Sequence, residues 1–300
     1  MACRNLLILG SMSLYISSLN SGSNGNCYYV GNDTDALLVD AGISCRETER
    51  RMQRLGLSMD RVRAIFVSHE HADHISGIRV LSKKYKLPVY ITPATLRSAG
   101  RILEKEHIRH FTTQEPVVVG GLRVDAFQKA HDAVDPHSFI ISYNSVKVGV
   151  LTDIGNCCEK VVTSFNQCDA VFLESNYCED MLMNGGYPYI LKKRISGGQG
   201  HLSNREALEL FIKYRSRKLR YLILSHLSEN NNKPELVESM FRPHAGKTEI
   251  VIAPRYAETP VFCITRNESD DTDTIPGEIQ IIHPGGVTIP LPSSQQLSLF

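Results

Sequence analysis

Short apolar runs recur along most of the chain, and polar loops rich in glycine, serine and asparagine separate many of them. Such runs predict strands buried in a sheet, at residues 15–19, 27–30, 37–42, 62–67, 88–91, 121–127, 138–143, 146–151, 170–174, 221–225 and 249–253. Helices are predicted between them, at residues 46–61, 75–85, 204–215 and 234–241. Because strands and helices alternate, we expect an α/β fold in which helices cover the faces of the sheets.

Length and composition indicate an ordinary globular protein. With 300 residues, 42% of them hydrophobic, the chain can form one large domain or two small ones. No apolar run approaches the roughly 20 residues of a membrane-spanning helix, and the run at 5–9 is shorter than the ~7 apolar residues of a signal-peptide core. We therefore expect a cytoplasmic protein without a membrane anchor. The strand pattern begins at Met12, so residues 1–11 are expected to be a non-structural leader or an artefact of the start codon.

The cysteines show no pattern typical of disulfides or of a metal site. Eight of them stand at positions 3, 27, 45, 157, 158, 168, 178 and 263, without a C-x-x-C pair or a regular spacing. Reduced thiols in a cytosolic protein explain this arrangement better than a disulfide framework or a structural zinc site.

The charge is unevenly distributed along the chain. The whole sequence carries a formal charge of +1, but residues 266–300 contain one arginine and five acidic residues, which leaves +5 on residues 1–265. A mildly basic body is compatible with a polyanionic substrate. The acidic, aromatic-free segment at 267–274 is typical of a disordered linker. We therefore expect a folded domain at 12–265 and a flexible acidic tail at 266–300.

One short segment concentrates side chains that bind metals. Three histidines and one aspartate stand within six positions, namely His69, His71, Asp73 and His74. Imidazole is the commonest metal ligand in proteins, and a carboxylate beside it suits a first-row divalent ion. The segment lies between the predicted strand at 62–67 and the predicted helix at 75–85. Because strand-end loops often present functional groups, we expect a metal site at this turn.

Three further candidate ligands each follow a predicted strand. His131 comes after the strand at 121–127, Asp153 after 146–151 and His226 after 221–225. A lone histidine in such a place is more often a surface or capping residue, but three in order make coincidence improbable. The other histidines are read as structural or surface residues, and neither His137 nor the neighbouring Asp132 is given a role.

The pattern H-x-H-x-D-H, with the later histidines and aspartate in the right order, resembles the metallo-β-lactamase superfamily over residues 12–265. The resemblance implies a four-layer αβ/βα sandwich and a metal-dependent hydrolase with two divalent ions, Zn²⁺ or Mn²⁺ and in some cases Fe²⁺. It implies that one ion is held by His69, His71 and His131. The second is implied to be held by Asp73, His74 and His226, with Asp153 bridging both ions. Asp40 is implied to lie behind the ligands.

A glycine-rich loop at 196–204 contains a further histidine, His201, just before the predicted helix at 204–215. Such a loop can present N–H groups to a phosphate at a helix N-terminus, and the histidine could protonate a leaving oxygen. Phosphodiesterase branches of the superfamily carry a non-ligand histidine in a comparable position. The alternative is an ordinary capping turn with Ser203 or Asn204 as N-cap. Asp73 and His201 are expected to be catalytic.

Three loops, at 19–27, 199–204 and 225–231, resemble the WalJ/YycJ group of metallo-hydrolases. That likeness implies a nuclease-type phosphodiesterase, a bacterial 5′-to-3′ exonuclease on double-stranded DNA that acts in repair or replication. Basic segments at 83–86, 192–194 and 213–220 either contact the DNA backbone or are solvated helix faces. The alternatives are a small-molecule hydrolase (cyclic phosphodiesterase, glyoxalase or lactamase) and a cell-wall or signalling regulator that retains its metals.

The last five residues suggest a protein partner. They resemble the pentapeptide by which many bacterial DNA polymerases and repair proteins dock on the sliding clamp, and they are Gln296, Leu297, Ser298, Leu299 and Phe300. After a flexible linker, the two terminal apolar residues would enter a hydrophobic pocket. Tethering to a ring around DNA would raise the local concentration of enzyme there. The alternative is a chain end without a partner.

Overall fold

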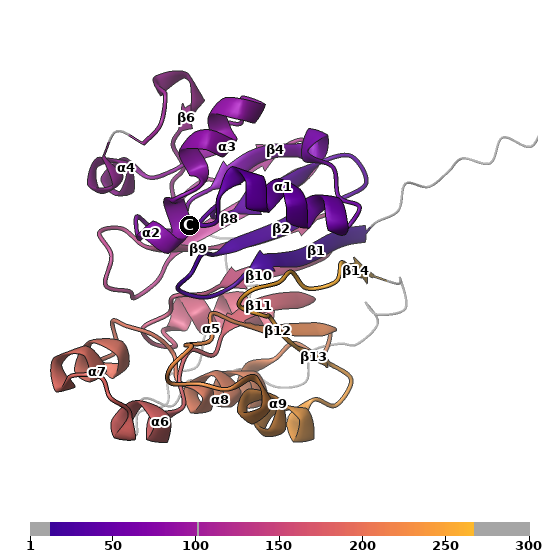
Figure 1. The fold of residues 1–300 in the computed structure, drawn as a ribbon. Helices are drawn as coiled ribbons and strands as arrows, with labels where there is room; N and C mark the ends of the chain where they lie inside the picture. The colour runs from indigo at the N-terminus through magenta and orange to yellow at the C-terminus, as the bar shows by residue number, and fades with distance from the viewer. Residues whose placement is uncertain (1–12, 101, 267–300) are drawn as a thin grey trace, which may run out of the picture. The chain divides into compact units, whose positions relative to one another are not determined.

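The computed structural model describes residues 13–100 and 102–266, which form two seven-stranded sheets packed face to face (Figure 1). Helices cover the outer face of each sheet, so the layers follow the order helix, sheet, sheet, helix. This arrangement confirms the expected αβ/βα sandwich. The leader expected at 1–11 lies outside the described residues, as do the acidic linker and the clamp-type pentapeptide.

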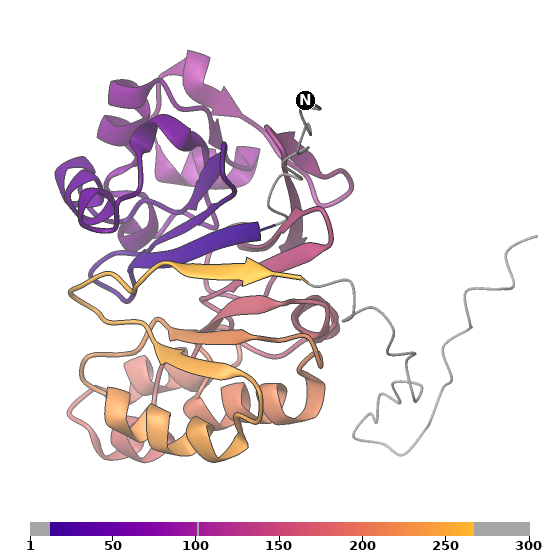
Figure 2. The ribbon, with the colours of Figure 1, turned by 90° about the vertical axis from the view of Figure 1, so that its right-hand side faces the viewer.

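The first sheet combines the early strands of the chain with one late strand. Its spatial order is β14 (Phe262–Thr265), β1 (Ser13–Asn20), β2 (Cys27–Gly31), β3 (Ala36–Val39), β4 (Val62–Phe66), β5 (Val89–Tyr90) and β6 (Ile108–Arg109). Strands β3 to β6 run parallel. Strand β14 pairs antiparallel with β1, and Figure 2 shows it as the yellow strand beside the indigo one.

The second sheet has the same number of strands. Its spatial order is β13 (Glu249–Ile252), β12 (Tyr221–Ser225), β11 (Ala170–Glu174), β10 (Val146–Leu151), β9 (His137–Tyr143), β8 (Leu122–Gln128) and β7 (Val117–Val119). Strands β10 to β13 run parallel. Strand β8 points the same way as β10, because both pair antiparallel with β9.

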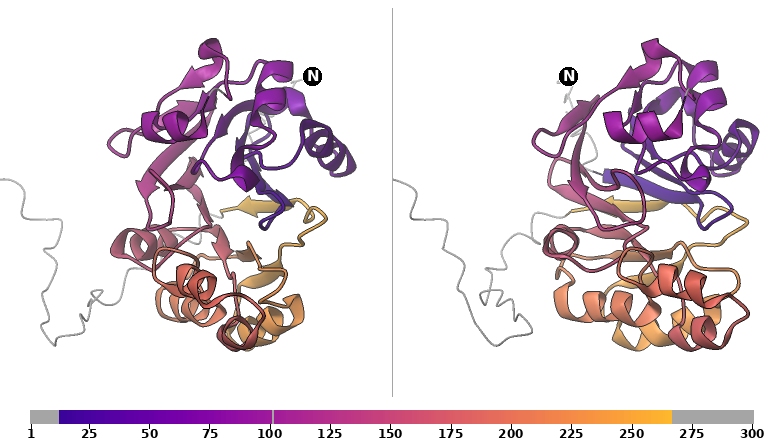
Figure 3. Two further views of the ribbon diagram at one scale, coloured as in Figure 1. Left: turned by 60° about the vertical axis from the view of Figure 1, so that its left-hand side comes forward. Right: turned by 90° about the vertical axis from the view of Figure 1, so that its left-hand side faces the viewer.

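The helices lie on both outer faces (Figure 3). Those against the first sheet are α1 (Cys45–Arg54), α3 (Ile78–Tyr85) and α4 (Pro93–Ala99). Those against the second are α5 (Glu159–Asn166), α8 (Asn204–Tyr214) and α9 (Pro234–Phe241). Three shorter or less buried helices stand in the connections, α2 (Ala72–Ile75), α6 (Glu179–Asn184) and α7 (Tyr189–Ser196).

Aromatic pairs join the two sheets across the central core. Tyr28 of β2 meets Phe172 of β11 with ring centroids 4.9 Å apart. Phe66 of β4 meets the edge of Phe139 of β9 at 5.6 Å. Pairs in such geometry contribute about 0.5–1.5 kcal/mol beyond the area they bury. The sheets are therefore fixed against each other close to the strand ends.

Two of the predicted helices are shorter than expected. The helix predicted at 46–61 ends at Arg54, with Leu55 as its C-cap, because Gly56 adopts a φ of +68° that side-chain-bearing residues rarely tolerate. The helix predicted at 75–85 is divided at Gly77, which passes so close to the neighbouring backbone that a Cβ there would lie 1.9 Å from the Ile43 oxygen. Strands β6, β7 and β14 were not predicted, because two to four residues carry no periodic signal.

The cysteines and the helices agree with the expectations drawn from composition. Within residues 13–266 the described cysteines are all free, namely Cys27, Cys45, Cys157, Cys158, Cys168, Cys178 and Cys263. None of the helices in the same part of the chain is long and apolar enough to cross a membrane.

The carboxyl ends of the parallel strands meet at one rim of the sandwich. Asp40 follows β3, Asp153 follows β10 and His226 follows β12. These three residues have φ values of 60°, 53° and 57°, in the left-handed region that non-glycine residues seldom occupy. Strained backbone of this kind persists where the surrounding structure holds it, and it is concentrated at functional sites.

Helix α2, which carries two of the candidate ligands, is a single turn held by neighbouring loops. The Ala41 N–H donates to the His74 carbonyl oxygen at 2.9 Å, and the Asn26 N–H donates to the Asp73 carbonyl oxygen at 2.7 Å. An isolated turn of helix is unstable in water, so these bonds fix its position. Gly42 lies directly against the turn, and a Cβ there would meet the Asp73 oxygen at 1.6 Å.

We therefore predict that Gly42→Ala displaces α2. Overpacking of this kind costs about 1–3 kcal/mol of unfolding free energy, and divalent-metal binding should weaken with it. Gly186→Ala is the matched control, because no atom lies within 4 Å of the Cβ it would add. Urea unfolding and metal titration of both variants would check this, and a Gly42→Ala protein as stable as the control would contradict it.

Candidate metal centre

Three histidines converge at the rim to form one group of donors. His69 and His71 come from the segment after β4, and His131 comes from the loop after β8. The Nε2 atom of His69 lies 3.1 Å from Nδ1 of His71, which lies 3.4 Å from Nε2 of His131. A hydrogen bond cannot satisfy all three nitrogens at once, whereas a cation among them can accept a lone pair from each.

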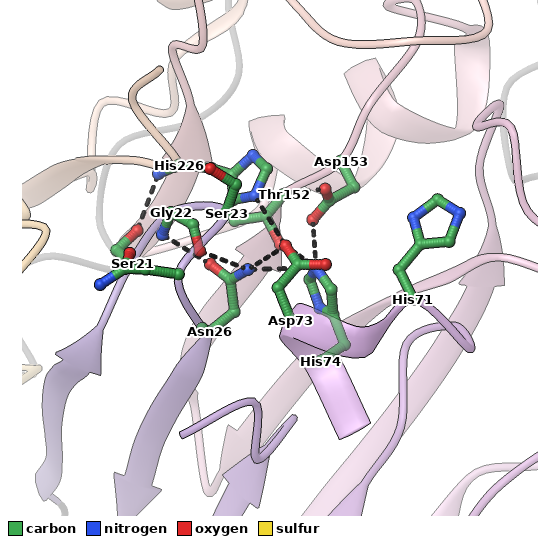
Figure 4. A network of polar contacts seen from close by, with 12 residues as sticks. Ser21, Gly22, Ser23, Asn26, His71, Asp73, His74, Thr152, Asp153 and His226 are labelled. Carbon is green, nitrogen blue, oxygen red and sulfur yellow. Dashed lines mark hydrogen bonds and ion pairs between the residues drawn. The ribbon is translucent and has the colours of Figure 1, made fainter. Parts of the chain in front are cut away.

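A second group of donors lies beside the first (Figure 4). The Oδ2 atom of Asp73 lies 3.4 Å from Nε2 of His74 and 3.5 Å from Nε2 of His226. Asp153 stands between the groups, with Oδ2 3.3 Å from His74 Nε2 and Oδ1 3.5 Å from His226 Nε2 and 3.9 Å from His131 Nε2. The structure thus brings together all seven residues predicted as ligands.

The start of the helix in this segment was predicted too late in the chain. The whole run was expected in the turn before a helix, but α2 begins at Ala72 with His71 as its N-cap residue. Asp73 and His74 are therefore helical. The turn of helix points both side chains toward the second sheet, which an extended loop could not do for adjacent residues.

Buried hydrogen bonds fix two of the imidazoles of the first sheet. Asp40 Oδ2 accepts from His74 Nδ1 at 2.7 Å and from the Ser68 hydroxyl at 2.7 Å. The same Ser68 Oγ lies 2.9 Å from Nδ1 of His69. With Nδ1 bonded in both rings, Nε2 is the nitrogen left with a lone pair that faces the site. Asp40 therefore lies behind the candidate ligands, as the family resemblance implied.

Glu174 fixes imidazole rings by hydrogen bonds in the second sheet, and it was not predicted from the sequence. This buried residue ends β11, and its Oε1 accepts from Nδ1 of His226 at 3.0 Å and of His201 at 2.8 Å. Its Oε2 accepts the backbone N–H groups of Ile154 at 2.7 Å and Leu202 at 3.1 Å. The sequence could have pointed to Glu174, because this acidic residue is the last residue of a predicted buried strand. The candidate metal ligands likewise stand at or just after the ends of predicted buried strands.

The electrostatics of the rim suit a cation. Burial lowers the pKa of His69 well below its usual value and that of His131 to about 4, so both rings are neutral and able to ligate. Burial also disfavours charge on His226, but Asp153 and the neighbouring carboxylates outweigh it and raise the pKa to about 10. Burial likewise raises the pKa of Glu174, and His201 and His226 bring it down to about 2. His69 and His131 therefore offer neutral nitrogen donors, and the carboxylates around His226 concentrate negative potential that attracts positive charge.

One buried atom supports a metal directly. Within the described part of the chain, Oδ2 of Asp153 is buried and accepts no hydrogen bond of acceptable geometry, although His74 Nε2 lies nearby. An unpartnered buried carboxylate oxygen is costly, and a bound cation removes that cost. The donors in each group lie within 4.8 Å of one another. Imidazole and carboxylate donors at this spacing fit a divalent metal ion.

His201 lies beside these donors, but its loop differs from the expected phosphate seat. Its backbone N–H donates to the Ile195 oxygen, and the Asn204 N–H donates to the Tyr177 oxygen. Ser203 is the N-cap of α8 and forms a capping box with Glu206. These two N–H groups are therefore not free for a phosphate, and Ser203 caps α8 as the alternative of a capping turn predicted. The His201 ring itself is 22% exposed and faces the site.

The two residues left without a role in the sequence analysis have different surroundings. Asp132 binds Arg194 through its carboxylate and approaches His131 Nε2 to 3.4 Å. His137 lies 2.9 Å from the Asp135 carbonyl oxygen through Nδ1 and packs against the ring of Phe111, away from both donor groups. Asp132 is therefore part of the rim, and His137 is a structural residue.

A cleft of about 240 Å³ opens over the donors. One side exposes the candidate metal donors and His201, and the other side is formed by helix α7. The residues that the cleft brings together include His71, Asp73, Asp153, His201, His226, Leu191, Arg194 and Ile195. A substrate in this cleft would contact both the donors and α7.

Comparison with known proteins agrees with the fold. Residues 36–226 match the family described as "Beta-lactamase superfamily domain". The YhfI protein of Bacillus subtilis, a metallo-β-lactamase fold protein, superposes with a TM-score of 0.65 at 17% identity and covers 82% of this chain and 99% of its own. The chain belongs to the metallo-β-lactamase superfamily and is a metal-dependent hydrolase.

Two relatives define its place in that superfamily. Exodeoxyribonuclease YycJ of Bacillus anthracis is 35% identical over 230 residues, which cover 75% of this chain and 86% of that protein. Exodeoxyribonuclease WalJ of Streptococcus pneumoniae serotype 2 (strain D39 / NCTC 7466) is 31% identical over 227 residues, 73% of this chain and 84% of that protein. The chain is thus a WalJ/YycJ-like metallo-hydrolase, as the three loops predicted.

We predict that Glu174→Gln weakens metal binding. A neutral amide cannot hold both histidine N–H groups as the carboxylate does, and loss of such a partner typically lowers metal affinity 10–100-fold. Glu115→Gln is the control for the charge change, because Glu115 is exposed and distant in sequence from Glu174. Competition with a chelating dye would measure both affinities. Equal affinity in the two variants would show that Glu174 does not orient the donors.

Proposed function

We propose that this chain is a DNA exonuclease that uses two divalent metal ions to hydrolyse phosphodiester bonds. The observation that carries the proposal is the pair of donor groups that share Asp153, at the bottom of a single open cleft. The two relatives named exodeoxyribonuclease are matched over more than four fifths of their length, which supports DNA as the substrate.

The two donor groups would each hold one ion. His69, His71 and His131 would bind the first. The second would be held by Asp73, His74 and His226, and Asp153 would reach both. Such donors accept Zn²⁺, Mn²⁺ or Fe²⁺, and we favour Zn²⁺ or Mn²⁺. When bound, a pair of divalent ions lowers the pKa of water to roughly 7 and stabilises the charge that develops on a phosphate.

His201 would then donate the proton that the leaving oxygen requires. Its Nδ1 atom is bonded to Glu174 at 2.8 Å, so Nε2 is the ring nitrogen left to exchange a proton with substrate. A buried carboxylate behind a histidine holds the ring in one tautomer and orientation. Asp73 would contribute to catalysis as a metal donor. Its Oδ2 accepts a hydrogen bond from Asn26 Nδ2 at 3.1 Å, which fixes the carboxylate.

The finer features of the activity rest on the resemblance of the three loops to the WalJ/YycJ group. A 5′-to-3′ direction, a preference for double-stranded ends and a role in DNA repair or replication in the cytoplasm are part of the proposal. The folded hydrolase would span residues 12–265. The basic segment at 192–194 belongs to helix α7 beside the cleft, where phosphate groups of a bound strand would lie.

We expect metal-stripped protein to digest linear duplex DNA once Mn²⁺ or Zn²⁺ is restored. End-labelled linear duplex, covalently closed circular DNA and single-stranded RNA would be compared. Loss of the linear duplex alone is the expected result. Asp73→Ala should be inactive, because it removes a donor. His201→Ala keeps every donor and should lower the rate about 10²–10⁴-fold, the usual contribution of one general acid.

Three outcomes would contradict this proposal. Digestion of the circle at the same rate as the linear duplex would exclude an exonuclease. No cleavage of any polymer by metal-loaded, folded protein, together with turnover of small esters, would favour the small-molecule hydrolase. Activity without added metal in chelated protein would exclude the metal mechanism altogether.

The C-terminal pentapeptide extends the proposal to a protein partner. Residues 296–300 lie outside the described structure, and the support is the resemblance of their sequence to sliding-clamp docking peptides. Attachment to a ring around DNA would compensate for the modest positive charge of the body.

Deletion of residues 296–300 should abolish clamp binding and leave DNA hydrolysis unchanged. Surface plasmon resonance with immobilised sliding clamp would compare the full chain with the truncated chain. Leu299→Ala with Phe300→Ala, at unaltered length, should have the same effect, because these side chains supply the apolar anchors. Unchanged clamp binding in both variants would refute the assignment.

A further inference from the structure

Helix α7 exposes its apolar residues to an unusual degree. None of its eight residues is buried, and the neighbouring helix α6 buries only Leu182. Tyr189 is 73% exposed and Ile190 is 82% exposed, the two highest values among the large hydrophobic residues that the structure describes. Apolar residues gathered at one place on a surface commonly mark an interaction site.

The helix is nevertheless attached firmly to the rim. Arg194 binds the carboxylate of Asp132, and the Ile195 carbonyl oxygen accepts the N–H of His201 at 2.9 Å. Gly200 packs so closely beneath the helix that a Cβ there would lie 2.2 Å from the Ile195 oxygen. The carbonyl oxygen of Gly200 in turn lies 2.8 Å from Nδ1 of His131. Helix α7 is therefore built against the metal centre.

Adjacent faces of α7 have different roles. Leu191, Arg194 and Ile195 line the cleft, opposite the metal donors. Tyr189 and Ile190 occupy the first turn of the helix. Lys193, which is also exposed, stands four residues after Tyr189 and three residues after Ile190. Residues at that spacing share one face of a helix. The exposed face thus combines an aromatic ring, an aliphatic side chain and a positive charge next to the cleft.

The chemistry of this face matches the end of a nucleic-acid duplex. The last base pair of a duplex offers an uncovered aromatic surface, on which tyrosine and isoleucine can pack, while interior base pairs are covered by their neighbours. The phosphates beside that base pair carry the charge that Lys193 and Arg194 would attract. A small ester in the cleft would reach the donors without touching Tyr189 or Ile190.

We infer that Tyr189 and Ile190 form a platform for the terminal base pair of a DNA duplex and thereby position its end at the metal centre. The inference rests on the proposed nuclease function and names the part of the substrate that the enzyme recognises. Lys193 binds a phosphate of the same end. Through this contact the enzyme distinguishes a duplex end from a continuous duplex.

The test uses the full chain with Tyr189→Ala and Ile190→Ser combined. The matched control combines Tyr256→Ala and Ile212→Ser, which are also exposed, at 66% and 46%, but do not line the cleft. Digestion of blunt duplex DNA and hydrolysis of bis(p-nitrophenyl) phosphate would be measured with the same metal. We expect KM for the duplex to rise at least tenfold in the platform variant only, with hydrolysis of the small diester unchanged.

Binding is measured separately, on metal-free protein and a duplex that ends in 2-aminopurine. Stacking on Tyr189 quenches the fluorescence of the terminal base, and the platform variant should lose that quenching. If wild type and platform variant digest duplex DNA with the same KM, the platform is refuted while the nuclease stands. If wild-type protein quenches the terminal base but hydrolyses no DNA, the platform stands and the nuclease is refuted. Absence of both signals refutes both.

Discussion

Three carboxylates, those of Asp40, Asp153 and Glu174, are buried between the two sheets, and the charge of each must be balanced inside the protein. Asp40 and Glu174 are balanced by imidazole and other hydrogen-bond donors around them. The imidazoles around Asp153 lie 3.3–3.9 Å away, and its Oδ2 accepts no hydrogen bond in the described residues. The buried ammonium of Lys129 donates instead to the carbonyl oxygen of Thr152. A bound cation at the rim would complete the balance, so the metal dependence of the hydrolase is tied to the electrostatics of its core as well as to its chemistry.

The rest of the fold can be understood as the means of bringing these charges together. The parallel strands of both sheets end at one rim, and aromatic pairs between the sheets fix the distance across it. Left-handed backbone at Asp40, Asp153 and His226 turns the chain sharply after each strand. The single turn of α2 is too short to stand alone, and the loops that contain Asn26 and Gly42 hold it in place. Local strain at the rim is thus supported by the packing beneath it.

Most of the donor cluster was readable in the sequence because each candidate ligand follows a buried strand, and strands are the elements that apolar runs reveal best. Glu174 was missed because it is the last residue of its strand and stands in no motif of its own. Helix α7 escaped prediction because its apolar residues face solvent, so they mark no buried stripe. The N–H groups of Leu202 and Asn204, before α8, were expected to be free, but they pair with Glu174 and Tyr177, which are far from them in the sequence. Pairings of this kind are fixed by the tertiary fold alone.

The order of the donors along the chain has a consequence for biosynthesis. The first donor group is complete with His131, but the second requires His226, and β12, which positions it, pairs with both β11 and β13. Nearly the whole second sheet must therefore leave the ribosome before both donor groups can be complete. We expect chains that end before β12 to lack hydrolytic activity, although they retain the first histidines.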